Sequence, residues 1–243
     1  MLTQRGKQLR KEAYYLAKQS GGYHHGGTFS TIELLYVLYD NVMTKHDKFI
    51  LSKGHACWGL YAILREKGYN PSLDCHPHLD TANGIDWTTG SEGHGMPAGI
   101  GMAFAKKKLK KEGRVFVLVG DGECQEGTTW ESLLIAGKHG LDNLTVIMDN
   151  NQIQGSGFTD DILPVGDKIG KVAKLCGWDV STIDGHDEAQ IYGALINKSD
   201  SRPQFIVANT IKGKGVDFME NRPEWHSKWP NLHEEVQLLI QLS

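Results

Sequence analysis

Strand-type and helix-type segments alternate through the second half of the chain, and this alternation restricts the fold more than any other feature. The strand-type segments, rich in apolar and β-branched residues, lie at 114–119, 144–151, 178–183 and 204–210. Segments with helical character separate them at 131–139, 167–176 and 187–198. Such alternation predicts right-handed βαβ units. We therefore expect an α/β fold, with a doubly wound and mainly parallel sheet that has helices on both faces.

The first third of the chain predicts helices and long loops around one further strand. In chain order we expect an amphipathic helix at 3–19, a glycine-rich break at 20–27, a second helix capped by Ser30 or Thr31, and a strand at 48–52. Residues 68–95 predict a long loop, and loops of that length in compact domains are usually functional. The whole chain, residues 1–243, is long enough to bury one core and is expected to form a single domain.

Composition and charge exclude several classes of partner. The net charge is −3 and charged residues are 23% of the chain, which is typical of a soluble protein that binds neither nucleic acid nor a membrane surface. No apolar run approaches the ~20 residues needed to cross a bilayer. The four cysteines lie far apart without a CxxC motif, which favours a reducing compartment. We expect a cytoplasmic protein.

Polar residues follow two of the predicted strands at the point where each strand ends. Asp121 lies between Gly120 and Gly122 after one strand, and Asn151 ends the next. The carboxyl ends of neighbouring parallel strands meet at one edge of a sheet. Mg²⁺ prefers such oxygen ligands, and the glycines and the helix that begins after Gly127 would favour a phosphate. The sequence therefore predicts a Mg²⁺–diphosphate site.

The spacing of these residues resembles the thiamine diphosphate signature, in which GDG is followed after about 25–30 residues by Asn. Here 28 residues, 123–150, separate Gly122 from Asn151. Other segments resemble transketolase N-terminal segments in the expected order: HHGGTFSTIELLYVLY (24–39), SKGHA (52–56), TTGSEGHGMPAGIGMA (88–103), GDGECQEGTTWES (120–132) and KGKGVDFMENRPEWH (212–226). The resemblance covers nearly the whole chain. It implies a thiamine diphosphate-binding fold and the N-terminal subunit of a split transketolase.

The resemblance also implies a role for individual residues. Mg²⁺, or Ca²⁺ or Mn²⁺ in its place, would be held by Asp121, Asn151 and the backbone carbonyl of Ile153. The residues expected to contact thiamine diphosphate are His55, Gly90, Glu92, Gly120, Asp121, Gly122, Glu123, Asn151, Ile153, Lys212 and His226. The residues expected to take part in catalysis are His24, His55, His76, His226, Glu126 and Glu131. Of these, His55 and His226 would also contact diphosphate oxygens, and His24 and His76 would bind sugar hydroxyl and carbonyl groups. Glu126 and Glu131 would form a proton relay between the two active sites of a dimer.

The implied function is transfer of a two-carbon ketol group from a ketose, phosphorylated in most such enzymes, to an aldose. Such a reaction moves a hydroxyl proton away and back, and imidazoles with pKa values near ~6.5 suit that traffic. In the family, the glutamate that activates the cofactor lies in a pyrimidine-binding domain outside this segment. The resemblance therefore implies a separately encoded C-terminal partner subunit, in an α₂β₂ assembly.

Two departures from the family pattern leave the substrate open. Glu92 stands where the family usually has an apolar residue, and Gly155 where it usually has Ile. Two other readings are the α subunit of a 2-oxo acid dehydrogenase, which typically lacks the SKGHA and PEWH segments, and a non-catalytic scaffold subunit. Cys75, His76 and His78 superficially resemble part of a zinc site, but no second ligand pair has the spacing of one.

Overall fold

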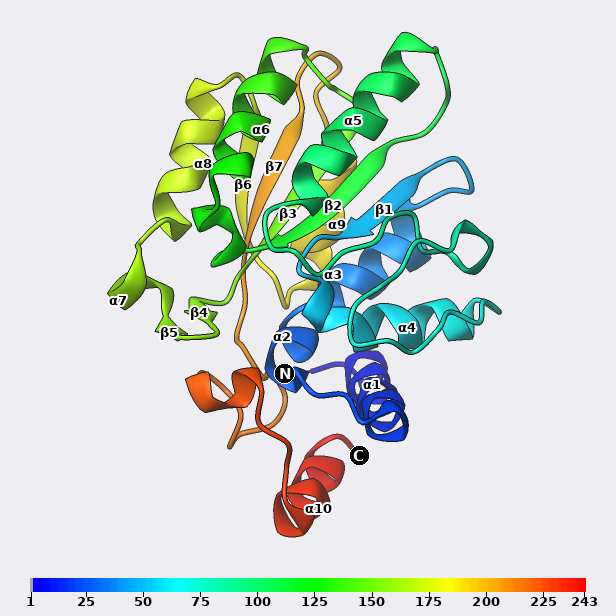
Figure 1. Ribbon diagram of the computed structural model, residues 1–243, viewed down its shortest axis with the longest axis vertical. Coiled ribbons are helices and arrows are strands. Elements are labelled where there is room, and N and C mark those ends of the chain that lie inside the picture. Colours follow the sequence, from blue (N-terminus) through cyan, green and yellow to red (C-terminus); the bar gives the residue numbers. More distant parts are fainter. Residues whose placement is uncertain (1) are drawn as a thin grey trace.

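A five-stranded parallel sheet forms the centre of the structure (Figure 1). The computed structural model describes residues 2–243, apart from the side chain of Asp167. The strands, in their order across the sheet, are β1 (Lys48–Leu51), β2 (Val115–Gly120), β3 (Leu144–Asn150), β7 (Gln204–Asn209) and β6 (Asp179–Asp184). Every neighbouring pair is parallel. Each of the five strands expected from the sequence is present, with its ends shifted by at most one residue.

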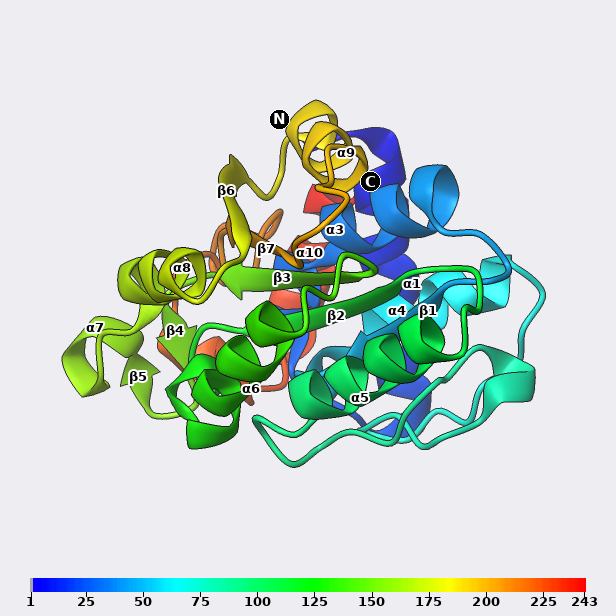
Figure 2. The same ribbon diagram turned by 90° about the horizontal axis from the view of Figure 1, so that it is seen from above.

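Helices cover both faces of this sheet, as Figure 2 shows from above. One face carries α5 (Gly95–Lys108), α6 (Gly127–Lys138) and α8 (Gly166–Leu175). The other face carries α3 (Ile32–Val37) and α9 (Glu188–Ile196), with α4 (Cys57–Glu66) and α1 (Gln4–Ser20) packed beyond α3. The expectation of a doubly wound α/β fold is therefore confirmed. No helix within residues 2–243 combines the length and apolar character needed to cross a membrane.

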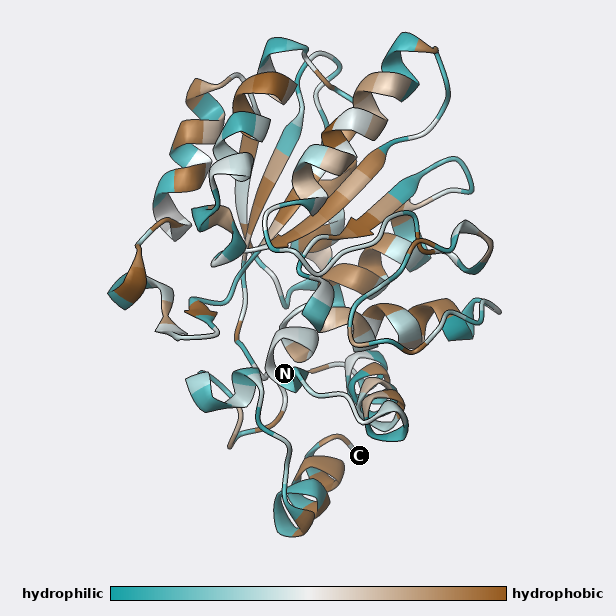
Figure 3. Cartoon of the chain, in the orientation of Figure 1, coloured by the Kyte–Doolittle hydropathy of each residue, from teal (hydrophilic) through white to brown (hydrophobic). Residues whose placement is uncertain are grey.

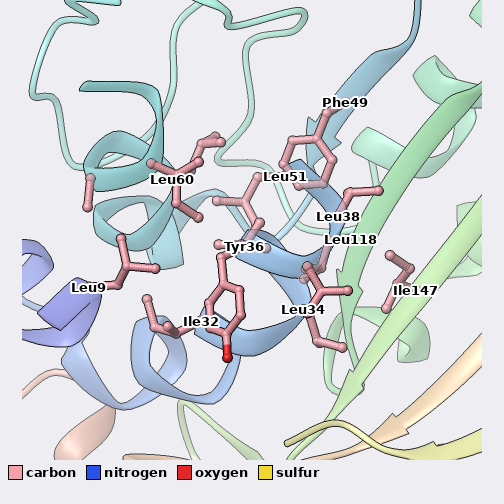
Figure 4. Close-up of a cluster of buried hydrophobic side chains, with 14 of the residues drawn as sticks. Leu9, Ile32, Leu34, Tyr36, Leu38, Phe49, Leu51, Leu60, Leu118 and Ile147 are labelled. Carbon is pink, nitrogen blue, oxygen red and sulfur yellow. The ribbon is translucent and has the colours of Figure 1, made fainter. Parts of the chain in front are cut away.

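The two hydrophobic cores use alternate residues of the same strands. On β2, Phe116 and Leu118 face the α3 side, and Val115 and Val117 face the α5 side. Figure 4 shows the first core, in which side chains of α1, α3 and α4 meet those of β1, β2 and β3. All residues of β2 and β3 are buried, and both strands are apolar over most of their length in Figure 3. Coverage on both faces explains why these strands are continuous apolar runs in the sequence.

The glycine-rich break expected at 20–27 is wrong in its second half. α1 ends at Gly21, whose φ of 68° is the left-handed conformation that often closes a helix. A further helix, α2 (His25–Ser30), begins soon afterwards and contains Gly26 and Gly27. A Cβ at Gly26 would lie 2.8 Å from the backbone oxygen of Trp225. Gly26 therefore serves the close packing of α2 and not a turn.

The capping role expected of Ser30 or Thr31 is also wrong. Thr31 occupies the N-cap position of α3, but its side chain caps no helix N–H. The Ser30 hydroxyl instead donates to the carboxylate of Asp149, at 2.7 Å. Tertiary contacts, and not a local cap, place this helix.

Several small elements were not expected from the sequence. A short hairpin of β4 (Ile153–Gln154) and β5 (Gly157–Phe158) precedes the single turn of α7 (Thr159–Ile162). The chain ends in α10 (Leu232–Gln241), which begins with a complete capping box between Asn231 and Glu234. This Asn-x-x-Glu pattern was a usable signal in the sequence.

A buried ion pair connects the N-terminal helices to the loop that follows β7. Arg10 on α1 donates to both carboxylate oxygens of Glu33 on α3, each at 2.7 Å. Glu33 also bonds His186 at 2.9 Å, and His186 accepts the N–H of Ile211. Burial opposes ionisation of Glu33, but Arg10 and His186 outweigh it and lower its pKa to about 2. The pair therefore fixes the position of residues next to Lys212.

His25 is a buried histidine that contributes packing and no polar contact. Its side chain is fully enclosed beside the rings of Tyr14, Phe29 and Trp229. Neither ring nitrogen has a hydrogen-bond partner among residues 2–243. Burial lowers the pKa of His25 to about 3, because a charged ring would lose its hydration.

We expect His25 to make the protein less stable in mild acid. Below about pH 6.5 the unfolded chain protonates this ring and the folded protein does not. The free energy of unfolding therefore decreases as the pH is lowered. Between about pH 7 and pH 5 the loss from this residue is about 2 kcal/mol. Urea unfolding at both values measures it, and His25→Phe should remove most of that difference. An equal pH dependence in wild type and variant would contradict the prediction.

Candidate functional site

The carboxyl ends of β2 and β3 open into a cleft of about 300 Å³. Gly120 on β2 is paired with Asp149 on β3, so the two strand ends are adjacent, as the sequence led us to expect. Ile153 and Gln154, which form strand β4 of the short hairpin, also line the cleft, and Figure 1 shows this hairpin below the main sheet. Its lining residues are Lys53, His55, Glu92, Gly120, Asp121, Gly122, Glu123, Gln125, Glu126, Asn151, Ile153, Gln154, Gly155, Lys212 and His226. Of the residues expected to contact the cofactor, only Gly90 is missing from this lining.

Asp121, Asn151 and Ile153, the three residues expected to hold a metal ion, all line this cleft. The Asp121 carboxylate accepts the backbone N–H of Gly122, at 2.7 Å, and that of Gln152. The amide oxygen of Asn151 accepts the N–H of Ile153, at 3.1 Å. A carboxylate, an amide oxygen and a backbone carbonyl are the hard ligands that Mg²⁺ takes. These residues fit the metal that the sequence implied.

The alternative of a zinc cluster finds no support. Within residues 2–243 there is no group of three or more His, Cys, Asp or Glu side chains placed to hold a metal. All four cysteines, Cys57, Cys75, Cys124 and Cys176, are free.

The fully buried carboxylate of Asp149 organises the residues around Asn151. It accepts hydrogen bonds from Ser30, at 2.7 Å, from Asn151 Nδ2, at 2.8 Å, and from the Thr210 hydroxyl, and it pairs with Lys53 Nζ. The amide nitrogen of Asn151 is thereby directed to Asp149, which leaves its oxygen for the metal side. Burial alone would raise the pKa of Asp149, but Lys53 and these bonds lower it.

Asp149 and Lys53 were both missed as site residues in the sequence. Each nevertheless belongs to a recognised segment: Asp149 ends the apolar strand at 144–151, and Lys53 lies in SKGHA. A charged residue inside or directly after a buried strand has to find a partner. That rule was the available signal, although it could not identify the partner.

Two buried lysines line the cleft. Lys53 is 2% exposed and Lys212 is 1% exposed. Lys212 Nζ donates to the backbone oxygen of Ile153 at 2.7 Å. Burial and the charge of Lys53 lower the pKa of Lys212 to about 7. An anion such as a diphosphate would relieve the repulsion between the two ammonium groups, so the cleft fits such a group.

The Glu123 side chain holds the loop over the cleft and does not point into solvent. Its carboxylate accepts the N–H of Gly93 at 3.0 Å, the N–H of Gly120 at 3.1 Å and the hydroxyl of Ser52. Burial and the nearby charge of Glu92 raise the pKa of Glu123 to about 7. With the side chain occupied in this way, the backbone of Glu123 is the part that can meet a cofactor.

Three histidines from distant segments lie against one another at the mouth of the cleft. The ring centroids of His24, His55 and His226 are separated by 5.0 to 5.2 Å. His24 Nδ1 lies 2.7 Å from the backbone oxygen of His226, and Lys212 donates to His226 Nδ1 at 2.9 Å. Burial lowers the pKa of all three rings, to about 2 for His226. The three rings are therefore neutral near pH 7, and each has one N–H group and one nitrogen lone pair for hydrogen bonds.

The remaining expected residues are divided between the rim and the surface. His76 lies beside Gly90, because a Cβ added at Gly90 would be 3.3 Å from the His76 ring. The backbone φ of Gly90 is 141°, a conformation that favours glycine. Glu126 lines the cleft directly before α6. Glu131 lies exposed on α6 and does not line the cleft, so this chain alone does not complete a Glu126–Glu131 relay.

Comparison with known proteins gives the same picture as the site. The family model described as "Transketolase, thiamine diphosphate binding domain" matches residues 9–239. One of the subunits of the apulose-4-phosphate transketolase of Actinobacillus succinogenes is 36% identical, over 99% of this chain and 95% of that protein. Subunit SqwG of the 6-deoxy-6-sulfo-D-fructose transketolase of a Clostridium species is 35% identical, over 84% of this chain and 82% of that protein.

Longer transketolases match over part of their length. Rat transketolase is 32% identical over 93% of this chain but only 40% of that protein. The crystal structure of transketolase from Campylobacter jejuni aligns with a TM-score of 0.89 and 27% identity, over 98% of this chain and 42% of that one. The chain thus belongs to the transketolase family, and it corresponds to the N-terminal subunit of the members that consist of two chains.

We expect Asp149→Asn to lower the free energy of unfolding by about 3 kcal/mol or more, since it leaves the buried Lys53 without a counter-charge. Asp142→Asn is the matched control, because Asp142 pairs with Lys107 while both side chains are partly exposed. Exposed pairs contribute about 0–1 kcal/mol. Urea unfolding compares the two variants. An equal decrease in the free energy of unfolding in both variants would mean that the buried pair stabilises the fold no more than the surface pair.

Proposed function

We propose that this chain transfers a two-carbon ketol group from a ketose to an aldose, using thiamine diphosphate and Mg²⁺, together with a separate C-terminal subunit. The observation that carries the proposal is the convergence of Asp121, Asn151 and the Ile153 carbonyl with two buried lysines in one cleft. Thiamine diphosphate, when bound, supplies the nucleophile and the electron sink. The protein supplies orientation and proton transfer.

The proposed roles follow from the geometry of the cleft. Asp121, Asn151 and the Ile153 carbonyl would hold Mg²⁺, or Ca²⁺ or Mn²⁺ in its place. Lys212, which donates to the Ile153 oxygen in this structure, would then bind the diphosphate. Gly122 permits close approach of backbone at this point, because a Cβ there would lie 2.8 Å from the Cβ of Gln154. The backbone of the loop at 90–92 meets the aminopyrimidine.

The substrate is held at the mouth of the cleft, where His24 and His76 bind its hydroxyl and carbonyl groups. The relatives named for apulose-4-phosphate and 6-deoxy-6-sulfo-D-fructose support a ketose that carries an anionic group. At Gly155 a Cβ would lie 3.5 Å from His226 Nε2, so the absence of a side chain there widens the space beside this ring. A specialised ketose fits such a pocket.

The partner chain contributes the pyrimidine-binding half of the active site. The relatives of Actinobacillus succinogenes and Phocaeicola vulgatus are each named as one subunit of a transketolase, which supports a second chain. We propose an α₂β₂ assembly in the cytoplasm, in which Glu126 and the exposed Glu131 of two copies of this chain connect the two active sites.

The direct test is a ketol-transfer assay with the C-terminal transketolase subunit encoded in the same genome. Each chain alone and the mixture are supplied with thiamine diphosphate, Mg²⁺ and a panel of phosphorylated, sulfonated and unmodified ketoses. We expect activity in the mixture only. Activity of this chain by itself would overturn the partner requirement. Decarboxylation of a 2-oxo acid, with no reaction on any ketose, would overturn ketol transfer, and a cofactor-loaded complex without any activity would favour a scaffold.

We expect Asp121→Ala to abolish Mg²⁺-dependent binding of thiamine diphosphate to the two-chain complex. A ligand that binds only the folded state raises the unfolding temperature, so cofactor plus Mg²⁺ should raise Tm of the wild-type complex and not that of the variant. Asp142→Asn, which changes a surface carboxylate, should behave as wild type. Equal binding by wild type and Asp121→Ala would show that Asp121 is not a metal ligand.

A further inference from the structure

A carboxylate–imidazole pair lies in the cleft at the position where this chain departs from the family pattern. Glu92 Oε1 is 3.0 Å from His55 Nδ1, and both residues line the cleft. The His55 side chain is 15% exposed and the Glu92 side chain 42% exposed. The imidazole is thus mostly enclosed, and the carboxylate reaches it from the more open side. An apolar residue at position 92 could not make this contact.

The contact leaves the other ring nitrogen of His55 for a different partner. Among residues 2–243, Nδ1 is the ring nitrogen of His55 that has a hydrogen bond. The Nε2 atom of His55 faces Gly27, and a Cβ added at Gly27 would lie 3.4 Å from it. The absence of a side chain at Gly27 keeps the space next to Nε2 open.

The surrounding charges decide which of the two groups holds the shared proton. Lys53 and Lys212 both face the pair, as do the rings of His24 and His76. Burial and the charge of Lys53 lower the pKa of His55 well below its usual value, so the ring is neutral. Burial raises the pKa of Glu92, and Lys53 opposes that rise. When Glu92 is ionised it can only accept, so a hydrogen bond at 3.0 Å then requires the proton on His55 Nδ1.

The two neighbouring histidines are fixed in different ways. His226 accepts from Lys212 on Nδ1, so its proton is on Nε2. His24 donates from Nδ1 to a backbone oxygen, so its Nε2 is an acceptor. His24 therefore carries its proton on Nδ1 and His226 on Nε2, and a different neighbour sets the tautomer of each ring.

We propose that Glu92 is a positioning residue that fixes His55 as the Nδ1–H tautomer and leaves a lone pair on Nε2 to accept a hydroxyl proton in the cleft. This departs from the role implied by resemblance, since a contact from His55 Nε2 to a diphosphate oxygen would need a proton on Nε2. The tautomer is a property of this chain alone, and only its chemical use rests on the proposed function.

In that use the proton moves in a closed cycle. The substrate hydroxyl O–H bond breaks, Nε2–H forms, and the ring becomes an imidazolium whose positive charge the Glu92 carboxylate stabilises. When the product hydroxyl forms, Nε2 returns the proton and the ring is neutral again. No other reactant is needed for this step.

The test of the tautomer is ¹⁵N NMR of the full chain with labelled histidine. Signals of His55 are assigned by their loss in His55→Gln. We expect a pyridine-type Nε2 and a protonated Nδ1 in wild type. Glu92→Leu should shift the population away from Nδ1–H, whereas Glu92→Gln, which keeps an acceptor oxygen, should retain it. A protonated Nε2 in wild type, or the same tautomer in Glu92→Leu, would overturn the proposal.

A matched control removes a carboxylate from the vicinity of a different histidine. Glu112 Oε2 lies 3.7 Å from His46 Nε2 at the surface. Glu112→Leu should leave the His55 signals unchanged. A change in those signals comparable to that of Glu92→Leu would mean that general charge, and not the contact, sets the tautomer.

The two-chain complex then tests the chemical use of this nitrogen. At saturating cofactor, Glu92→Leu should lower kcat at least about 10-fold with a smaller effect on the KM of the ketose, since general acid–base groups typically contribute ~10²–10⁴-fold. Unchanged kcat would overturn this use. A wild-type complex inactive on every ketose would overturn the proposed function and with it this use, while the spectra alone decide the tautomer.

Discussion

The fully buried carboxylate of Asp149 is the contact on which the rest of the site depends. It joins Ser30 at the end of α2, Lys53 after β1, Asn151 beyond β3 and Thr210 beyond β7. A buried charge is tolerated only when it is both paired and hydrogen-bonded, and no single segment supplies all of these partners. The same contacts therefore pack the helices against the sheet and place the side chains at the strand ends. The amide of Asn151 is oriented by the same bonds that stabilise the fold.

A second buried network connects the N-terminal helices to Lys212, another residue that lines the cleft. Arg10 and Glu33 connect α1 with α3, and His186 passes the connection to the backbone of Ile211. Lys212 is the next residue, and it spans the cleft to the Ile153 oxygen. The N-terminal helices, which contribute few residues to the cleft lining, thus decide where a buried ammonium group lies. Such networks are most effective when every member is satisfied.

The chemistry of the cleft depends on the burial of its three histidines and on the different hydrogen-bond partner that each of them has. Burial keeps His24, His55 and His226 neutral, and the two lysines reinforce this effect. Neutral imidazoles differ only in which nitrogen holds the proton, so the neighbour of each ring decides what that ring can do. A backbone oxygen, a carboxylate and an ammonium group serve as these neighbours. His226 therefore presents an N–H group to the shared space, whereas His24 and, in the proposed tautomer, His55 each present a lone pair.

The sequence by itself determined the parallel sheet and the meeting of Asp121 with Asn151, because continuous apolar runs and strand ends are local features, and parallel strands align their carboxyl ends. It failed at α2, where glycines that read as a break serve close packing against Trp225. Only the tertiary structure decided that Lys53 pairs with Asp149 and that Glu92 meets His55. These partners are far apart along the chain, and a local pattern shows that a buried charge needs a partner but not which residue the fold brings to it.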